Sequence, residues 1–153
     1  MDPDRELDRA AEEPMAAALA ALSIWATAAG ALWLHAFLGI PGAYLGQGYP
    51  LYPGIKVTLT DLALTSLGAT LPILLVAALA RRFALRWLAL PPIVLLWLLA
   101  ATFVIQPFSI DFGTTWAATE PLTELFLHPI HTPVALVLIV AAAVRTLAPR
   151  KAT

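Results

Sequence analysis

Four apolar runs, each long enough to cross a lipid bilayer, constrain the fold of this chain more than any other feature. The runs cover about residues 15–38, 58–80, 84–105 and 122–147. A helix needs about 20 apolar residues to span the hydrocarbon core of a membrane. With 60% hydrophobic and only 12% charged residues, the chain also has too few charges to cover a surface in water. The sequence therefore predicts an all-α integral membrane protein, folded as a four-helix bundle.

The domain organisation predicted from these runs is simple. Residues 1–13 carry six acids and two arginines and are predicted to form an acidic cytoplasmic tail. Residues 14–148 form a single transmembrane domain, and residues 149–153 form a second cytoplasmic tail. The segment 39–56 is rich in glycine, proline and tyrosine, which predicts a loop at the membrane surface.

Prolines interrupt the last two predicted spans. Pro91 and Pro92 lie within the third span and are expected to kink it. Pro129 and Pro133 interrupt the fourth span, so a bent helix and a short interfacial helix followed by a short span both fit the sequence.

The basic residues predict the orientation of the chain in the membrane. Eight of the nine lysines and arginines fall on one side of the predicted bundle, and Lys56 alone falls on the other. The eight are Arg5, Arg9, Arg81, Arg82, Arg86, Arg145, Arg150 and Lys151. Basic residues are enriched on the cytoplasmic side of membrane proteins. We therefore expect a multi-pass protein of the cell inner (plasma) membrane, with both termini in the cytoplasm.

All three histidines fall near the outer ends of the predicted helices. If residues 120–131 are helical, Glu124, His128 and His131 stand at positions i, i+4 and i+7 and share one face. This arrangement suits zinc, iron or copper, with His35 or Asp61 as a further ligand from another helix. The alternative is that these histidines bond only to headgroups, water and loop carbonyls, since Pro129 disturbs the helix that a metal site needs.

Two further hypotheses concern the same end of the molecule. His35 with His128 or His131 could bind a haem between helices, although the pattern requires no cofactor and identifies none. Asp61 stands three residues after Thr58, where a carboxylate caps a helix. The alternative role of Asp61 is to hold a proton or a cation within the membrane.

Several classes of function are disfavoured by what the sequence lacks. The chain has no cysteine, so it has neither disulfides nor thiolate chemistry. It contains no phosphate-binding glycine loop, no G-x-S-x-G and no H-E-x-x-H motif, which argues against an enzyme. The net charge of −1 argues against nucleic acid as a partner.

Small residues form one face of the first predicted span. Ala16, Ala20, Ser23, Thr27 and Gly30 make up this face. Such faces let helices approach closely in lipid, either within one chain or between chains. The leading hypothesis is a non-enzymatic accessory, assembly or interaction subunit, whose partners besides the bilayer are other membrane subunits or a second copy. A small cation- or proton-binding or transport protein is the second hypothesis, and a haem- or quinone-binding redox subunit is the third.

The order of these features resembles a family of small bacterial four-helix membrane proteins of unknown function. The resemblance covers most of residues 15–147 and includes a threonine-rich segment with Asp61, a basic turn and His128 before the last span. This chain differs from the family pattern in having Pro129 and His131 directly after that histidine. The resemblance implies the four-helix fold, and it brings no assigned activity.

Overall fold

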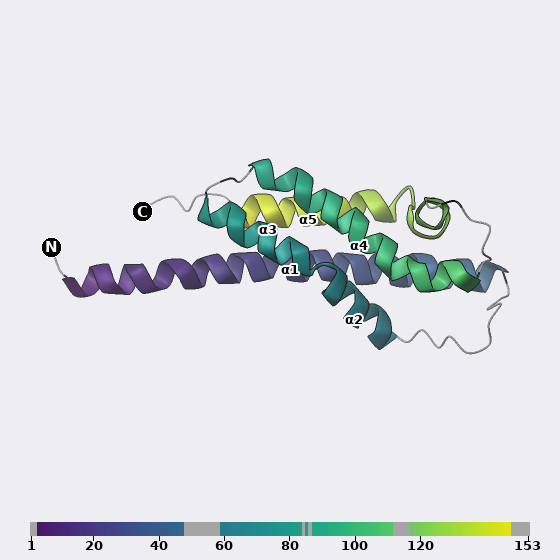
Figure 1. The fold of residues 1–153 in the computed structure, drawn as a ribbon, viewed down its shortest axis with the longest axis horizontal. Helices are drawn as coiled ribbons and strands as arrows, with labels where there is room; N and C mark the ends of the chain where they lie inside the picture. The colour runs from purple at the N-terminus through teal and green to yellow at the C-terminus, as the bar shows by residue number, and fades with distance from the viewer. Residues whose placement is uncertain are drawn as a thin grey trace.

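The computed structural model describes a chain built from helices that lie side by side (Figure 1). Its backbone is described over residues 3–47, 59–83, 85, 87–111, 117 and 119–147, and its side chains over 14–38, 62–83, 85, 87–106, 117, 119–124 and 126–147. The elements are α1 (Pro3–Gln47), α2 (Leu59–Ala69), α3 (Leu71–Arg82), η1 (Trp87–Ala89), α4 (Leu90–Asp111), η2 (Leu122–Phe126) and α5 (His131–Leu147). The all-α class is therefore confirmed for the described residues.

Three helical segments are long and apolar enough to cross a membrane. They are Pro14–Leu38, Leu62–Arg82 and Trp87–Gln106, and they correspond to the first three predicted spans. The fourth apolar helix, α5, has 17 residues and is shorter than the predicted span 122–147. The composition of the folded helices thus agrees with a membrane protein.

Helix α1 extends beyond the predicted span 15–38 at both ends. It begins at Pro3, within the predicted acidic tail, and continues to Gln47 through part of the predicted loop. A proline inside a helix, such as Pro41, removes one hydrogen bond, here to the carbonyl of Phe37, and also crowds that carbonyl. Extending an existing helix is much less costly than starting a new one, which explains why the helix passes this proline. The rest of the predicted loop, residues 48–56, and the tail 149–153 lie outside the described residues.

The second predicted span is divided into α2 and α3, which differ in direction (Figure 1). Pro72 stands in the first turn of α3 and cannot donate to the carbonyl of Gly68. Thr70 separates the two helices, and its hydroxyl donates to the carbonyl of Ser66 at 2.7 Å. The break therefore follows from one proline, and the Thr70 hydroxyl adds a second bond to a carbonyl that already accepts the Thr70 backbone N–H at 3.2 Å.

The third predicted span begins later than expected. The short 3-10 helix η1 precedes α4, which begins at Leu90, so Pro91 and Pro92 lie in the first turn of α4. The first N–H groups of a helix have no acceptor within it, and proline is tolerated there. The prediction that Pro91 and Pro92 kink the interior of this helix was therefore wrong.

The segment predicted as the fourth span contains two separate elements. The π-helical turn η2 ends at Phe126, and the next residue, Leu127, has the φ of −67° and ψ of 119° of extended chain. Helix α5 begins only at His131. Of the two alternatives open from the sequence, the structure has the short helical segment followed by a shorter apolar helix.

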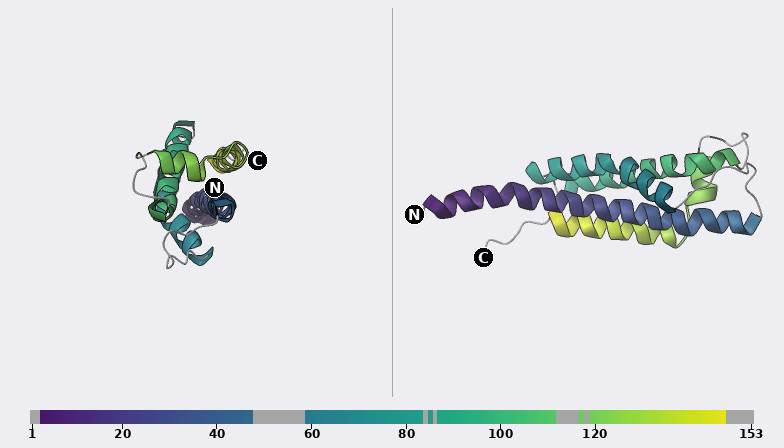
Figure 2. Two further views of the ribbon diagram at one scale, coloured as in Figure 1. Left: turned by 90° about the vertical axis from the view of Figure 1, so that its right-hand side faces the viewer. Right: turned by 90° about the horizontal axis from the view of Figure 1, so that it is seen from below.

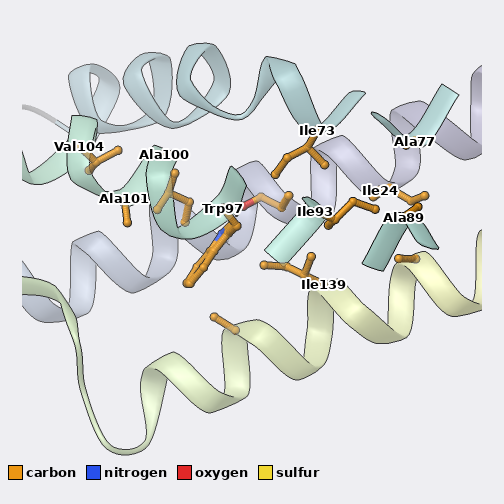
Figure 3. Close-up of a cluster of buried hydrophobic side chains, with 14 of the residues drawn as sticks. Ile24, Ile73, Ala77, Ala89, Ile93, Trp97, Ala100, Ala101, Val104 and Ile139 are labelled. Carbon is orange, nitrogen blue, oxygen red and sulfur yellow. Dashed lines mark hydrogen bonds between the residues drawn. The ribbon is translucent and has the colours of Figure 1, made fainter. Parts of the chain in front are cut away.

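Helix α1 lies centrally, and α2, α3 and α5 pack against it (Figure 2). Large side chains from different helices meet small ones in the core, as the close-up of Figure 3 shows. The buried residues of this core include Ile24, Ala28, Ile73, Ala77, Ile93, Trp97, Ala100, Ala101, Ile139 and Ala143. The indole N–H of Trp97 donates to the backbone carbonyl of Ala28 at 3.1 Å, a bond that joins α4 to α1.

Candidate functional site

His35 is a buried polar residue of α1, with only 2% of its surface exposed. Its Nε2 lies 2.8 Å from the hydroxyl oxygen of Thr132, in the first turn of α5. The same hydroxyl oxygen accepts the backbone N–H of His128 at 2.9 Å. One threonine side chain therefore connects α1, the start of α5 and the segment that precedes α5.

Aromatic side chains surround the ring of His35. Phe126 stacks on it with ring centroids 3.9 Å apart and an interplanar angle of 8°. The ring of Trp97 lies edge-on to that of His35, with the two centroids 6.0 Å apart. The centroid of the Trp97 ring is also 5.6 Å from that of Phe126. Phe126 is the last residue of η2, and only 1% of it is exposed. The turn η2 thus places an aromatic ring against the histidine and separates it from solvent.

His128 and His131 form a second pair at the start of α5. Their rings stack with centroids 4.0 Å apart and an interplanar angle of 16°. Nδ1 of His128 accepts the backbone N–H groups of Ile130 at 3.1 Å and His131 at 3.2 Å. Because Nδ1 is an acceptor, the proton of the neutral ring is on Nε2. His128 therefore caps the turn before α5, and in this role Nδ1 cannot bind an ion.

Two buried ring nitrogens at this site have no hydrogen-bond partner among the described residues: Nδ1 of His35 and Nδ1 of His131. The two rings are neighbours, with centroids 6.1 Å apart and nearly perpendicular planes at 87°. Buried polar atoms without partners are uncommon in folded proteins because each costs free energy. These nitrogens are therefore the chemically distinctive feature of the site.

The predicted face of Glu124, His128 and His131 is not formed, because residues 127–130 leave the helical conformation that the i, i+4, i+7 spacing requires. Glu124 is exposed. Over the described side chains, no group of three histidines, aspartates or glutamates is placed to hold a metal ion. Asp61 lies in α2, but its side chain is outside the described part, so its predicted capping or ion-binding role stays a prediction.

The structure brings together His35 and His131, which the sequence offered only as one of several pairs. Thr132 and Phe126 were not among the candidate residues. The one available signal for Thr132 was a hydroxyl directly after His131 at the start of an apolar run. The haem hypothesis stays a prediction, and the stacked Phe126 already covers one face of its proposed ligand His35.

No protein-family model, no curated protein and no solved structure matches this chain. The resemblance to small bacterial four-helix membrane proteins accordingly stays a prediction.

Proposed function

We propose that this protein is a multi-pass protein of the cell inner membrane, folded as a four-helix bundle, which acts as a non-enzymatic interaction subunit. Three apolar helical segments support a membrane location. Helix α5 is the fourth span of this proposal. Its 17 residues extend about 25 Å at 1.5 Å per residue, close to the roughly 30 Å of the hydrocarbon core.

Large apolar side chains around the outside of the helices support contact with lipid. Exposed examples occur on several helices: Leu19, Leu75, Leu95, Phe103 and Val137. A soluble monomer rarely exposes so continuous an apolar surface. In a membrane the same side chains are solvated by lipid acyl chains.

A hydrogen bond between two helix ends supports the proposed orientation. The guanidinium of Arg81, at the end of α3, donates to the backbone carbonyl of Thr146 at 2.6 Å. Arg82 and Arg145 lie in the last turns of the same two helices. Basic residues of α3 and α5 therefore meet at one end of the molecule, as expected for a cytoplasmic side.

The observation that carries the interaction role is the position of Gly30. A Cβ atom added to Gly30 would meet nothing within 4 Å, and Ser23 on the same face is exposed. Ser23 and Gly30 of the predicted small-residue face of α1 are exposed, whereas Ala16, Ala20 and Thr27 are half-buried. The core forms on another side of this helix, around Ala28. In lipid, an outward face of small residues favours close packing with another transmembrane helix.

Photo-crosslinking in native membranes tests this function. A photoreactive amino acid replaces Gly30 in one variant, and in the control it replaces Leu75, an exposed residue on the outside of α3. A discrete protein adduct from position 30 and none from position 75 is expected. The size and composition of the adduct distinguish a second copy of the chain from another subunit. Labelling of lipid alone from both positions would overturn the proposal.

A further inference from the structure

The unpartnered Nδ1 atoms of the neighbouring His35 and His131 rings have the chemistry of a two-ligand metal site, a role beyond that of an interaction subunit. Both Nδ1 atoms are buried without a hydrogen-bond partner among the described residues. Two imidazoles that share one ion through nitrogen–metal bonds of about 2 Å hold their ring centroids roughly 6 Å apart. The observed centroid separation of 6.1 Å permits such a shared ion, and it is also a separation that ordinary edge-to-face ring pairs have.

The hydroxyl of Thr132 supplies the outer contact that a metal-binding histidine requires. Its oxygen has two lone pairs and can accept both the N–H of His128 and an Nε2–H of His35. Donation from Nε2 leaves Nδ1 of His35 with a lone pair available for an ion. Histidine ligands in metal sites usually donate their second ring nitrogen in this way, which orients the ring.

The surroundings of the two nitrogens indicate which class of ion fits. Calcium and magnesium require several oxygen ligands, and structural zinc requires four ligands. Among the described side chains, this site offers two buried imidazole nitrogens without a partner. Phe126 and Trp97 make the site apolar. The free-energy cost of burying an ion there is therefore lower for a monovalent ion than for a divalent one. Imidazole is a good ligand for copper, and the monovalent copper ion accepts two-coordinate geometry.

We propose that His35 and His131 bind one copper(I) ion between their Nδ1 atoms. The ligands come from α1 and from the first residue of α5, so the ion joins two helices at the end opposite the Arg81 contact. His128 is not a ligand in this site, because its Nδ1 accepts two backbone N–H groups. It stacks on His131 and fixes the turn that presents this ring.

Competition with a chromogenic copper(I) chelator tests the proposal on the full chain, purified in detergent under anaerobic, reducing conditions. The native protein is expected to withdraw one equivalent of copper(I) from the chelator. His131→Phe keeps a stackable ring without nitrogen and is expected to bind at least tenfold more weakly, as is His35→Phe. Glu124→Gln is the control, since Glu124 is exposed and lies outside this site, and it is expected to bind like the native protein.

A spectroscopic measurement on the unmodified sequence covers the case in which a variant fails to fold. Protein with ¹⁵N-labelled histidine is titrated with silver(I), a redox-inert ion with the same coordination preference. The Nδ1 resonances of His35 and His131 are expected to shift at one equivalent, whereas those of His128 stay in place. Failure of the native protein to bind either ion, undiminished binding by folded His131→Phe, or a shift at His128 alone would overturn the proposal.

Discussion

The ring of His35 and the hydroxyl of Thr132 are joined by a 2.8 Å hydrogen bond, although 97 positions separate the two residues in the chain. This contact fixes the start of α5 against α1. It also connects to the segment after η2, because the same hydroxyl accepts the backbone N–H of His128. Thr132 therefore holds α1, the start of α5 and the segment after η2 together at the end of the molecule that contains the three histidines.

Replacement of Thr132 by valine tests the strength of this connection. Valine has nearly the same shape but leaves both Nε2 of His35 and the N–H of His128 without their partner. The expected loss is about 1–3 kcal/mol of unfolding free energy, measured by denaturant titration in mixed detergent micelles. Thr123→Val is the control, since the exposed Thr123 hydroxyl donates only to carbonyls of its own turn, at 3.0 Å for Glu120. Equal destabilisation by both variants would contradict this role of Thr132.

Trp97→Phe tests the contact between α4 and α1. The substitution removes the N–H that donates to the carbonyl of Ala28 and leaves space beside Phe126 and His35. We expect a loss of about 1–3 kcal/mol in the same unfolding assay. Trp87→Phe serves as the comparison because Trp87 is 71% exposed, and its effect should stay within about 0.5 kcal/mol. A loss from Trp87→Phe as large as that from Trp97→Phe would argue against the described core.

The packing of α5 predicts opposite responses at two alanines on one helix. Ala143 is completely buried, whereas Ala141 is exposed. Leucine at position 143 has no space in the core and is expected to destabilise the protein by about 1–3 kcal/mol. Leucine at position 141 should have little effect, since it adds an apolar side chain to an apolar outer surface. Thermal unfolding in detergent distinguishes the two variants, and the reverse order would mean that α5 is rotated from the described position.

Single cysteines test the proposed orientation directly, because the native chain has none. Phe83 and Ile130 are both exposed. Phe83 follows the end of α3, which contacts the end of α5, whereas Ile130 precedes the start of α5, so the two residues lie at opposite ends of the helices. With both termini in the cytoplasm, a membrane-impermeant maleimide applied from the outer side should label Ile130→Cys. Phe83→Cys should react only after the membrane is permeabilised. Labelling of Phe83→Cys alone from outside would reverse the topology.

Local sequence signals predicted the helical class and the approximate positions of the apolar segments. Apolar length is a local property, and so are the effects of Pro72 and of Pro91 and Pro92 on hydrogen bonds that a helix can or cannot form. The errors arose where neighbouring structure overrides a local signal. Helix α1 continues past Pro41 to Gln47 because a long helix already exists there, and the predicted kink at Pro91 and Pro92 is absent because α4 begins beside them.

The candidate site was only partly accessible from sequence. The chain alone placed three histidines near one end of the predicted helices, since this follows from topology and residue order. Helical spacing then suggested Glu124, His128 and His131 as a group, but Leu127 adopts an extended conformation and separates Glu124 from the other two. A single backbone conformation thus changed which side chains can meet.

The sequence by itself determined that this is a chain of apolar helices, because the length and composition of each run decide whether it can be solvated by lipid. Tertiary structure alone decided that His35 meets Thr132, Phe126 and His131 rather than water. It also decided that Gly30 faces outward while Ala28 faces the core. The physical reason is that burial and side-chain hydrogen bonds depend on how the helices are rotated and packed against each other, which the apolar pattern of these nearly uniform helices does not specify.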